Sequence, residues 1–160
     1  MAEKSGADIL IEALIAQGVD TVFGYPGGAV LPIYDALFQH PKIRHVLVRH
    51  EAGAAHAAEG YARSTGKPGV VLVTSGPGAT NASIGVHTAY QDSTPMILFI
   101  GQVGNDFIDR EAFQEIDYRR MYGQMAKWVA QIDRADRIPE YIARAFQVAT
   151  SGRPGPVVLA

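Results

Sequence analysis

The sequence predicts an α/β fold, in which a doubly wound, mostly parallel sheet of about six strands has helices on both faces. Short apolar runs of strand length alternate along the chain with segments of helical periodicity, and turn residues separate them. Two of the runs, residues 70–74 (VVLVT) and 96–100 (MILFI), are almost entirely apolar. Such continuous runs are typical of parallel strands that helices cover on both sides.

The amino-terminal half begins with a helix and continues as two strand–helix units. Ser5 with Asp8 three residues later resembles a capping box, and Gly18 is suited to end the helix that follows. The other expected elements are a strand at residues 21–23, a turn at 24–28, a helix over 29–39, a strand at 45–48 and a helix over 51–65.

The carboxyl-terminal half repeats this alternation with one long interruption. Residues 105–123 are polar and irregular, which indicates a loop with one helical turn. Pro139 suits the first turn of the last helix. The expected elements are strands at residues 70–74, 96–100, 128–130 and 157–160, and helices over 79–91 and 139–150.

Length and composition indicate one globular domain. A chain of 160 residues is within the usual range of ~100–200 residues for a domain. Its composition, with 48 % hydrophobic and 19 % charged residues, excludes a disordered protein. The net charge of −2, without a basic block, disfavours a nucleic-acid partner. The absence of cysteine excludes disulfides and a cysteine nucleophile, and it fits a cytoplasmic protein.

Targeting and membrane segments are not expected. Residues 1–5 lack a basic and then apolar signal segment, and no apolar run approaches the ~20 residues that span a bilayer. The last expected strand has no polar turn or tail after it, so we expect the chain to stop inside a larger protein.

Four of the expected strands end in residues suited to bind a ligand. The carboxyl ends of parallel strands meet at one edge of the sheet, and ligands of open α/β sheets bind there. Glycine lets a ligand approach the backbone and the N–H groups of a following helix, although turn chemistry alone is an alternative explanation of these glycines. The four ends are residues 24–28 (GYPGG), 50–51 (HE), 74–78 (TSGPG) and 101–102 (GQ).

Three common site types are disfavoured by spacing. The dinucleotide motif G-x-G-x-x-G does not occur in the sequence. Ser75 does not stand in a G-x-S-x-G turn, so a hydrolase triad is disfavoured. His50 and His56 are six residues apart, about 240° around a helix, and cannot share a metal ion as H-E-x-x-H does. We expect no metal ligands in this chain.

Glu51 stands between an expected strand and an expected helix. A carboxylate there could serve a ligand at the edge of the sheet, or it could simply complement the helix dipole. Ala54, Ala55 and Ala58 leave one side of the helix lined with small residues. Small side chains allow another backbone to come close, so we expect this helix to pack tightly against a neighbour.

Five short motifs follow one another along the chain. They are residues 24–28 (GYPGG), 49–51 (RHE), 57–63 (AAEGYAR), 74–81 (TSGPGATN) and 112–115 (AFQE). In this order and spacing they resemble the thiamine-diphosphate enzymes, and the chain is most similar to the N-terminal, pyrimidine-binding domain of acetolactate synthase catalytic subunits. Each motif alone is weak, but the resemblance covers nearly the whole chain, and five motifs in order are specific.

The resemblance implies that Glu51 is the catalytic residue. Thiamine diphosphate carries the chemistry of this family. A carboxyl group at one ring nitrogen of its aminopyrimidine lets the exocyclic amine remove the proton from C2, and an apolar pocket favours the neutral acid that this contact needs. Residues 1–160 would then be the pyrimidine-binding domain of a carboligase that decarboxylates pyruvate and joins the product to a second 2-keto acid.

The resemblance also implies two sets of binding residues around the glutamate. Thr74, Pro77 and Asn81 match the segment that lines the pyrimidine site, although Thr74 and Asn81 could be ordinary strand-end and helix-cap groups. Phe113 and Gln114 match residues that reach the substrate pocket and cover the glutamate, although a loop aromatic can also merely pack.

A further loop matches the residues near the cofactor ring in the partner's active site. Its members are Tyr25, Gly27, Gly28 and Ala29. Glu59 and Arg63, by contrast, form an i,i+4 pair that we expect to be surface support.

One segment departs from the family pattern. Acetolactate synthases usually have small residues before the AFQE motif, whereas residues 106–111 here include Arg110 and Glu111. The substrate is therefore open, and a related decarboxylase or carboligase acting on another 2-keto acid is the alternative. Glyoxylate carboligase is disfavoured, because that relative lacks a glutamate at this position.

Other parts of the family's site lie outside this sequence. The G-D-G segment and paired asparagines that bind diphosphate and Mg²⁺ belong to a C-terminal domain, and FAD, where present, belongs to a middle domain. We therefore expect the isolated chain to be inactive and to form a homodimer through the helices at 51–65 and 79–91. The second subunit would cover the small-residue surface of Ala54, Ala55 and Ala58, which would otherwise be an exposed apolar patch. The diphosphate-binding domain would come from the same or the partner chain. A split-gene subunit and a non-catalytic interaction domain are the alternatives to an enzyme fragment.

Overall fold

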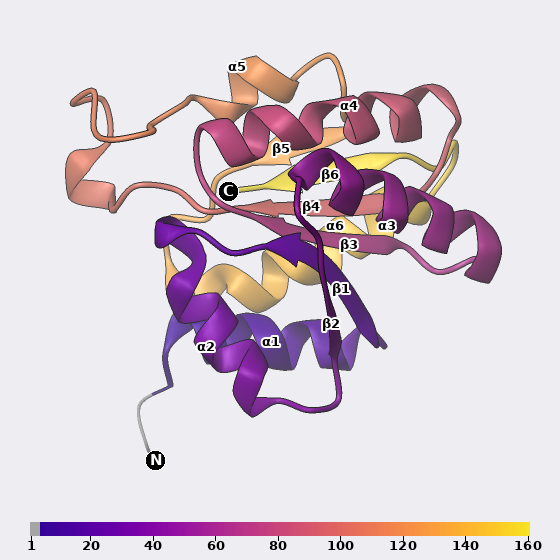
Figure 1. The fold of residues 1–160 in the computed structure, drawn as a ribbon, viewed down its shortest axis with the longest axis horizontal. Coiled ribbons are helices and arrows are strands. Elements are labelled where there is room, and N and C mark those ends of the chain that lie inside the picture. Colours follow the sequence, from indigo (N-terminus) through magenta and orange to yellow (C-terminus); the bar gives the residue numbers. More distant parts are fainter. Residues whose placement is uncertain (1–3) are drawn as a thin grey trace.

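A parallel sheet of six strands forms the centre of the structure (Figure 1). The structure is a computed structural model that describes residues 4–160, so the first three of the residues 1–5 considered above for a signal segment lie outside the described part. The strand order is β2-β1-β3-β4-β6-β5, and every pair is parallel. The strands are β1 (Thr21–Tyr25), β2 (Arg44–Leu47), β3 (Gly69–Val73), β4 (Met96–Ile100), β5 (Trp128–Ala130) and β6 (Pro156–Leu159).

Within residues 4–160, three helices cover each face of the sheet (Figure 1). This arrangement confirms the predicted doubly wound α/β class. None of the described helices has both the length and the hydrophobicity to cross a membrane. One face carries α1 (Gly6–Ala16), α2 (Leu31–Gln39) and α6 (Ile138–Thr150), and the other carries α3 (Glu51–Thr65), α4 (Pro77–Gln91) and α5 (Tyr118–Tyr122).

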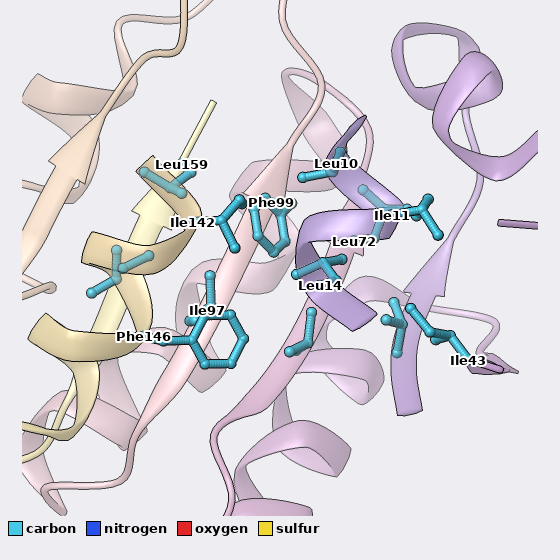
Figure 2. Close-up of a cluster of buried hydrophobic side chains, with 14 of the residues drawn as sticks. Leu10, Ile11, Leu14, Ile43, Leu72, Ile97, Phe99, Ile142, Phe146 and Leu159 are labelled. Carbon is cyan, nitrogen blue, oxygen red and sulfur yellow. The ribbon is translucent and has the colours of Figure 1, made fainter. Parts of the chain in front are cut away.

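Successive strand residues supply two separate cores. Val71 and Val73 of β3 belong to the core under α3 and α4, whereas Leu72 belongs to the core under α1 and α6. Figure 2 shows the second core, in which Phe99 of β4 and Ile142 of α6 also lie. Because helices bury both sides, these strands are apolar throughout and do not alternate with polar residues.

The small residues of α3 pack against α4 of the same chain. Ala54, Ala55 and Ala58 are fully buried, and a Cβ atom added at Gly85 of α4 would overlap the Cβ of Ala55. The predicted close packing is confirmed. The interpretation of these alanines as an otherwise exposed patch that a second subunit covers is wrong, because Gly85 lets the two helices meet within one chain.

Glu59 is buried, so the pair that it forms with Arg63 does not lie on the surface as predicted. The residue is 9 % exposed, and its Oε1 accepts hydrogen bonds from Oγ1 of Thr94, at 3.1 Å, and from Nε of Arg63. Arg63 also pairs with Asp92, just after α4. The i,i+4 pair exists, but it ties α3 to the turn between α4 and β4.

Several element boundaries differ from the prediction by one or two residues, and two of these differences have a physical reason. β1 continues through Gly24 and Tyr25, because the missing side chain of Gly24 leaves room for the hydroxyl group of Tyr34 and the carbonyl oxygen of Leu72. The helix expected from residue 79 begins at Pro77, since proline is suited to the first helical position.

Residues 105–123 contain two short helical segments and not the single turn expected. They are the 3₁₀ turn η2 (Asn105–Phe107) and α5. Asp117 caps α5 by accepting hydrogen bonds from the two backbone N–H groups that follow Tyr118. Tyr118 and Tyr122 are buried and supply the core-facing side of this otherwise polar helix.

Candidate functional site

The winding of the sheet reverses between β1 and β3. The chain leaves β1 towards α2 on one face and leaves β3 towards α4 on the other (Figure 1). In open α/β sheets such a reversal opens a crevice at the carboxyl ends of the two strands, where ligands bind. Gly27 and Thr74 meet there, since a Cβ atom added to Gly27 would lie 2.6 Å from the Cβ of Thr74.

Glu51 lies at the start of α3. The preceding residue, His50, caps this helix, and its Nδ1 accepts a hydrogen bond from the N–H of Ala52 at 3.1 Å. Glu51 is only 7 % exposed. The helix dipole favours a carboxylate at this end, but dipole complementation does not require burial, and a buried carboxyl group needs hydrogen-bond partners.

Two residues of α4 lie against the carboxyl group, and a tyrosine lies within reach of its charge. Asn81, in the second turn of α4, donates its side-chain amide to Oε2 of Glu51 at 2.9 Å, so it is not merely a helix cap. A Cβ atom at Gly78 would lie 3.2 Å from Oε1. Tyr34 donates its hydroxyl to the carbonyl oxygen of Leu72 at 3.1 Å, and burial, followed by the charge of Glu51, raises its pKa above the ordinary value. Tyr34 is therefore a neutral donor beside the site.

The side chain of Thr74 has incomplete hydrogen bonding. Its Oγ1 is buried and, among the described residues, has no hydrogen-bond partner. Leaving a hydroxyl group in this state costs about 1–3 kcal/mol. Gly27 and Gly78 pack directly against this side chain, since a Cβ at either position would come within 3 Å of Thr74. An incoming polar group could complete the hydrogen bonding of the hydroxyl group.

Two tyrosines hold the amino-terminal end of α4 and were missed in the sequence. The N–H of Gly76, which has φ +51°, donates to Oη of Tyr118 at 2.9 Å. The hydroxyl of Tyr122 donates to the carbonyl oxygen of Ala79. The signal that could have found them is their i,i+4 spacing in a segment that otherwise reads as a polar loop.

The loop after β1 and the start of α4 form an exposed rim. Tyr25 is 39 % exposed, and Gly28, Ala29 and Pro77 are also exposed. Ala29 backs onto Gly101 at the end of β4, where an added Cβ would lie 2.7 Å from the Cβ of Ala29. These predicted residues are thus at the edge of the crevice and not in its buried part.

Phe113 and Gln114 are placed very differently. Gln114 covers the start of α4: its Oε1 accepts a hydrogen bond from Oγ of Ser75 at 3.3 Å, and a Cβ at Gly76 would lie 2.8 Å from the Cβ of Gln114. Phe113 is 86 % exposed, so the alternative that it merely packs in its loop is wrong for this chain. Its contact with a substrate, like the cover that Gln114 would give to Glu51, stays a prediction.

A polar cavity of about 620 Å³ lies under the segment that carries these two residues. The cavity is lined by Gln102, Ile108, Asp109, Glu111, Glu115, Ile116, Asp117, Arg119, Gln131 and Asp133, and Glu51 lies outside it. Within residues 4–160, no three histidine or carboxylate side chains stand close enough together to hold a metal ion.

Comparison with known families identifies the family of this chain. The family described as "Thiamine pyrophosphate enzyme, N-terminal TPP binding domain" matches residues 4–121. The chain belongs to this family. Its members bind thiamine pyrophosphate, which is another name for thiamine diphosphate, and all the predicted site residues lie within the matched range.

Three relatives of this thiamine pyrophosphate enzyme domain are named acetolactate synthases. The acetolactate synthase large subunit of Haemophilus influenzae is 52 % identical over 99 % of this chain, and isozyme 3 of Escherichia coli is 54 % identical over 99 %. The mitochondrial catalytic subunit of Saccharomyces cerevisiae is 51 % identical over 97 %. The chain covers 28 %, 28 % and 23 % of these three relatives, so it spans about a quarter of their length.

Proposed function

We propose that this chain forms the pyrimidine-binding half of the active site of a thiamine-diphosphate-dependent 2-keto acid carboligase of the acetolactate synthase type. The observation that supports this most is the buried carboxyl group of Glu51, which accepts a hydrogen bond from Asn81. The unpaired hydroxyl group of Thr74 lies at the same edge of the sheet. Burying a carboxyl group and a hydroxyl group is unfavourable unless their hydrogen bonds are completed, and a ligand would complete those of Thr74.

The residues present fit the aminopyrimidine of the cofactor. Thiamine diphosphate, when bound, supplies the carbon nucleophile that attacks a 2-keto acid. Glu51 would share a proton with a ring nitrogen, and Asn81, by binding Oε2, leaves Oε1 for that contact. Thr74 would donate or accept a hydrogen bond, while the glycine at 78 lets a flat ring approach. Pro77 would line the same site from the first turn of α4.

The exposed rim would serve the second active site of a dimer. Tyr25 ends β1, and Gly27, Gly28 and Ala29 follow it in the loop where a partner could bring its own cofactor. The exposure of Tyr25, Gly28 and Ala29 supports this assignment, because a residue that contacts a partner's ligand must be accessible in the single chain.

The substrate we propose is pyruvate, with a second 2-keto acid as acceptor. The relatives that are about half identical to this chain are named acetolactate synthases, which favours this reaction over a decarboxylase for another keto acid. Phe113 and Gln114 would contact the substrate from the loop above α4. The intact Glu51 argues against a non-catalytic interaction domain.

Other domains would complete the site. We propose that Mg²⁺ and the diphosphate bind a C-terminal domain of the same or the partner chain, and that a middle domain binds FAD. The length of the relatives supports this, since residues 1–160 correspond to about a quarter of each. On this proposal residues 1–160 are one of three domains.

The reaction can be tested in the protein that carries this domain, supplied with thiamine diphosphate, Mg²⁺ and FAD. We expect pyruvate alone to yield 2-acetolactate, identified by NMR, and pyruvate with 2-ketobutyrate to yield the mixed product as well. Free acetaldehyde as the main product would identify a decarboxylase instead. Cofactor binding without turnover of any 2-keto acid would support the non-catalytic alternative.

The outer surface of α3 and α4 supports the proposed homodimer on grounds other than the buried alanines. Helix α4 contains no Asp, Glu, Lys or Arg, and it exposes Ile84 to 55 %. Gly53 and Gly60 lie on one side of α3, and a Cβ added at either would meet nothing within 4 Å. A glycine inside a helix costs about 0.5–1 kcal/mol relative to alanine, so the close approach of a second copy would explain both.

Gly60→Leu in the same full-length protein tests this dimer. Leucine is the better helix former, so the stability of the domain should not fall, while the dimer dissociation constant should rise at least tenfold as measured by sedimentation velocity. Ala16→Leu, at the exposed end of α1 on the opposite face of the sheet, is the matched control. Unchanged association of the Gly60→Leu variant would place the dimer contact elsewhere.

A further inference from the structure

The loop that carries Phe113 and Gln114 has a backbone that is unfavourable for its residues. Asp109, Glu111 and Gln114 have φ values of +61°, +53° and +64°. Residues other than glycine rarely adopt this left-handed conformation, and it persists only where the surrounding structure enforces it. The shape of the loop therefore requires a restraint.

Glu115 supplies that restraint. Its Oε1 accepts a hydrogen bond from the N–H of Asp109 at 2.6 Å, and its Oε2 accepts one from the N–H of Ala112 at 3.0 Å. Its own N–H donates to the carbonyl oxygen of Ala112 at 3.0 Å. One carboxylate thus joins the beginning and the middle of the loop to its end.

The restrained loop in turn sets the two residues between Ala112 and Glu115. Gln114 is held over Ser75 and Gly76 at the start of α4, and Phe113 projects into solvent without packing in this chain. Loss of the restraint would let the left-handed residues relax, and both side chains would move relative to α4.

We propose that Glu115 is a positioning residue, whose carboxylate fixes the 109–114 loop and so places Phe113 and Gln114 for the keto-acid substrate. The inference rests on the proposed function for its kinetic consequence only. The carboxylate is required because both of its oxygens accept from backbone donors, whereas an amide of the same shape has one acceptor oxygen and would point its N–H₂ at a donor.

Amide hydrogen exchange tests the restraint without reference to catalysis. In the full-length, cofactor-free protein, Glu115→Gln should speed exchange at Asp109 and Ala112 at least tenfold and leave the melting temperature within about 2 °C of wild type. Asp106→Asn removes the same charge from an exposed position of the same segment and should leave exchange unchanged. Unchanged protection in the Glu115→Gln variant, or a general loss of stability, would overturn the inference.

Steady-state kinetics test the consequence for the substrate. We expect Glu115→Gln to raise the KM for the keto acid at least tenfold while the Kd of thiamine diphosphate changes less than threefold. Glu115→Asp keeps two acceptor oxygens and should recover part of the loss. A variant that loses kcat and cofactor affinity together, or that behaves like Asp106→Asn, would contradict a positioning role. A wild-type protein without carboligase activity would instead refute the proposed function and leave the exchange result standing.

Discussion

Replacing Glu51 with glutamine is expected to slow removal of the thiamine C2 proton by about 100- to 1,000-fold, or about 3–4 kcal/mol, in the full-length enzyme. Glutamine has nearly the same shape and can still accept the hydrogen bond from Asn81, so the fold should be unchanged. It cannot share an acidic proton with the pyrimidine ring, and proton transfer at this site is the role proposed for Glu51.

Exchange of the C2 proton for deuterium, followed by NMR after acid quench, measures this step directly. Glu59→Gln is a matched control, because Glu59 is a second buried glutamate of α3 whose bonds go to Thr94 and Arg63. We expect that control to lose stability and to keep the wild-type exchange rate. Wild-type exchange in the Glu51→Gln variant would remove Glu51 from the catalytic role.

The part of the site that sequence could predict is the part that the parallel sheet brings together. Thr74 directly follows a strand, Glu51 begins the helix after another strand, and Asn81 lies one turn into a helix. Parallel strands place all their carboxyl ends at one edge, so the order of the elements alone predicts that these residues meet. Strands β3 and β4 could be predicted equally well from their apolar runs, because a strand that is buried on both faces contains no polar residues.

What sequence could not predict depends on contacts between distant segments. Tyr118 and Tyr122 have helical spacing, but this spacing does not show that their hydroxyl groups bond to Gly76 and Ala79 at the start of α4. The restraint by Glu115 is visible only in the backbone angles of its loop. The side of α3 lined with small residues did indicate that this helix packs closely. A pattern within one helix does not identify its neighbour, however, and the structure shows that the neighbour is α4 at Gly85.

The isolated 160-residue chain is expected to bind thiamine diphosphate with a Kd of about 1 mM or weaker, which corresponds to about −4 kcal/mol. A pyrimidine pocket contributes only a few kcal/mol after the entropy of association is subtracted. The phosphates carry much of the cofactor's charge, and binding them through Mg²⁺ requires oxygen ligands. Among the described residues no such group of side chains occurs.

Three of the four lysines of this chain are held by partners, and Lys42 stands just before β2, at the opposite edge of the sheet from Glu51. Lys4 pairs with Glu12, Lys67 pairs with Asp20, and Lys127 donates to the carbonyl oxygens at the end of α6. The phosphates should therefore add almost nothing to the affinity of the isolated chain.

Calorimetry of the isolated chain with Mg²⁺ can separate the two ends of the cofactor. Thiamine without phosphates should bind about as weakly as thiamine diphosphate, because both would use only the pocket of Glu51, Thr74 and Asn81. In the full-length protein the same pair of ligands should differ by at least 100-fold, since the diphosphate then meets its own domain. Micromolar binding of thiamine diphosphate to the isolated chain, or turnover of pyruvate without added protein, would show that a complete site lies within these 160 residues.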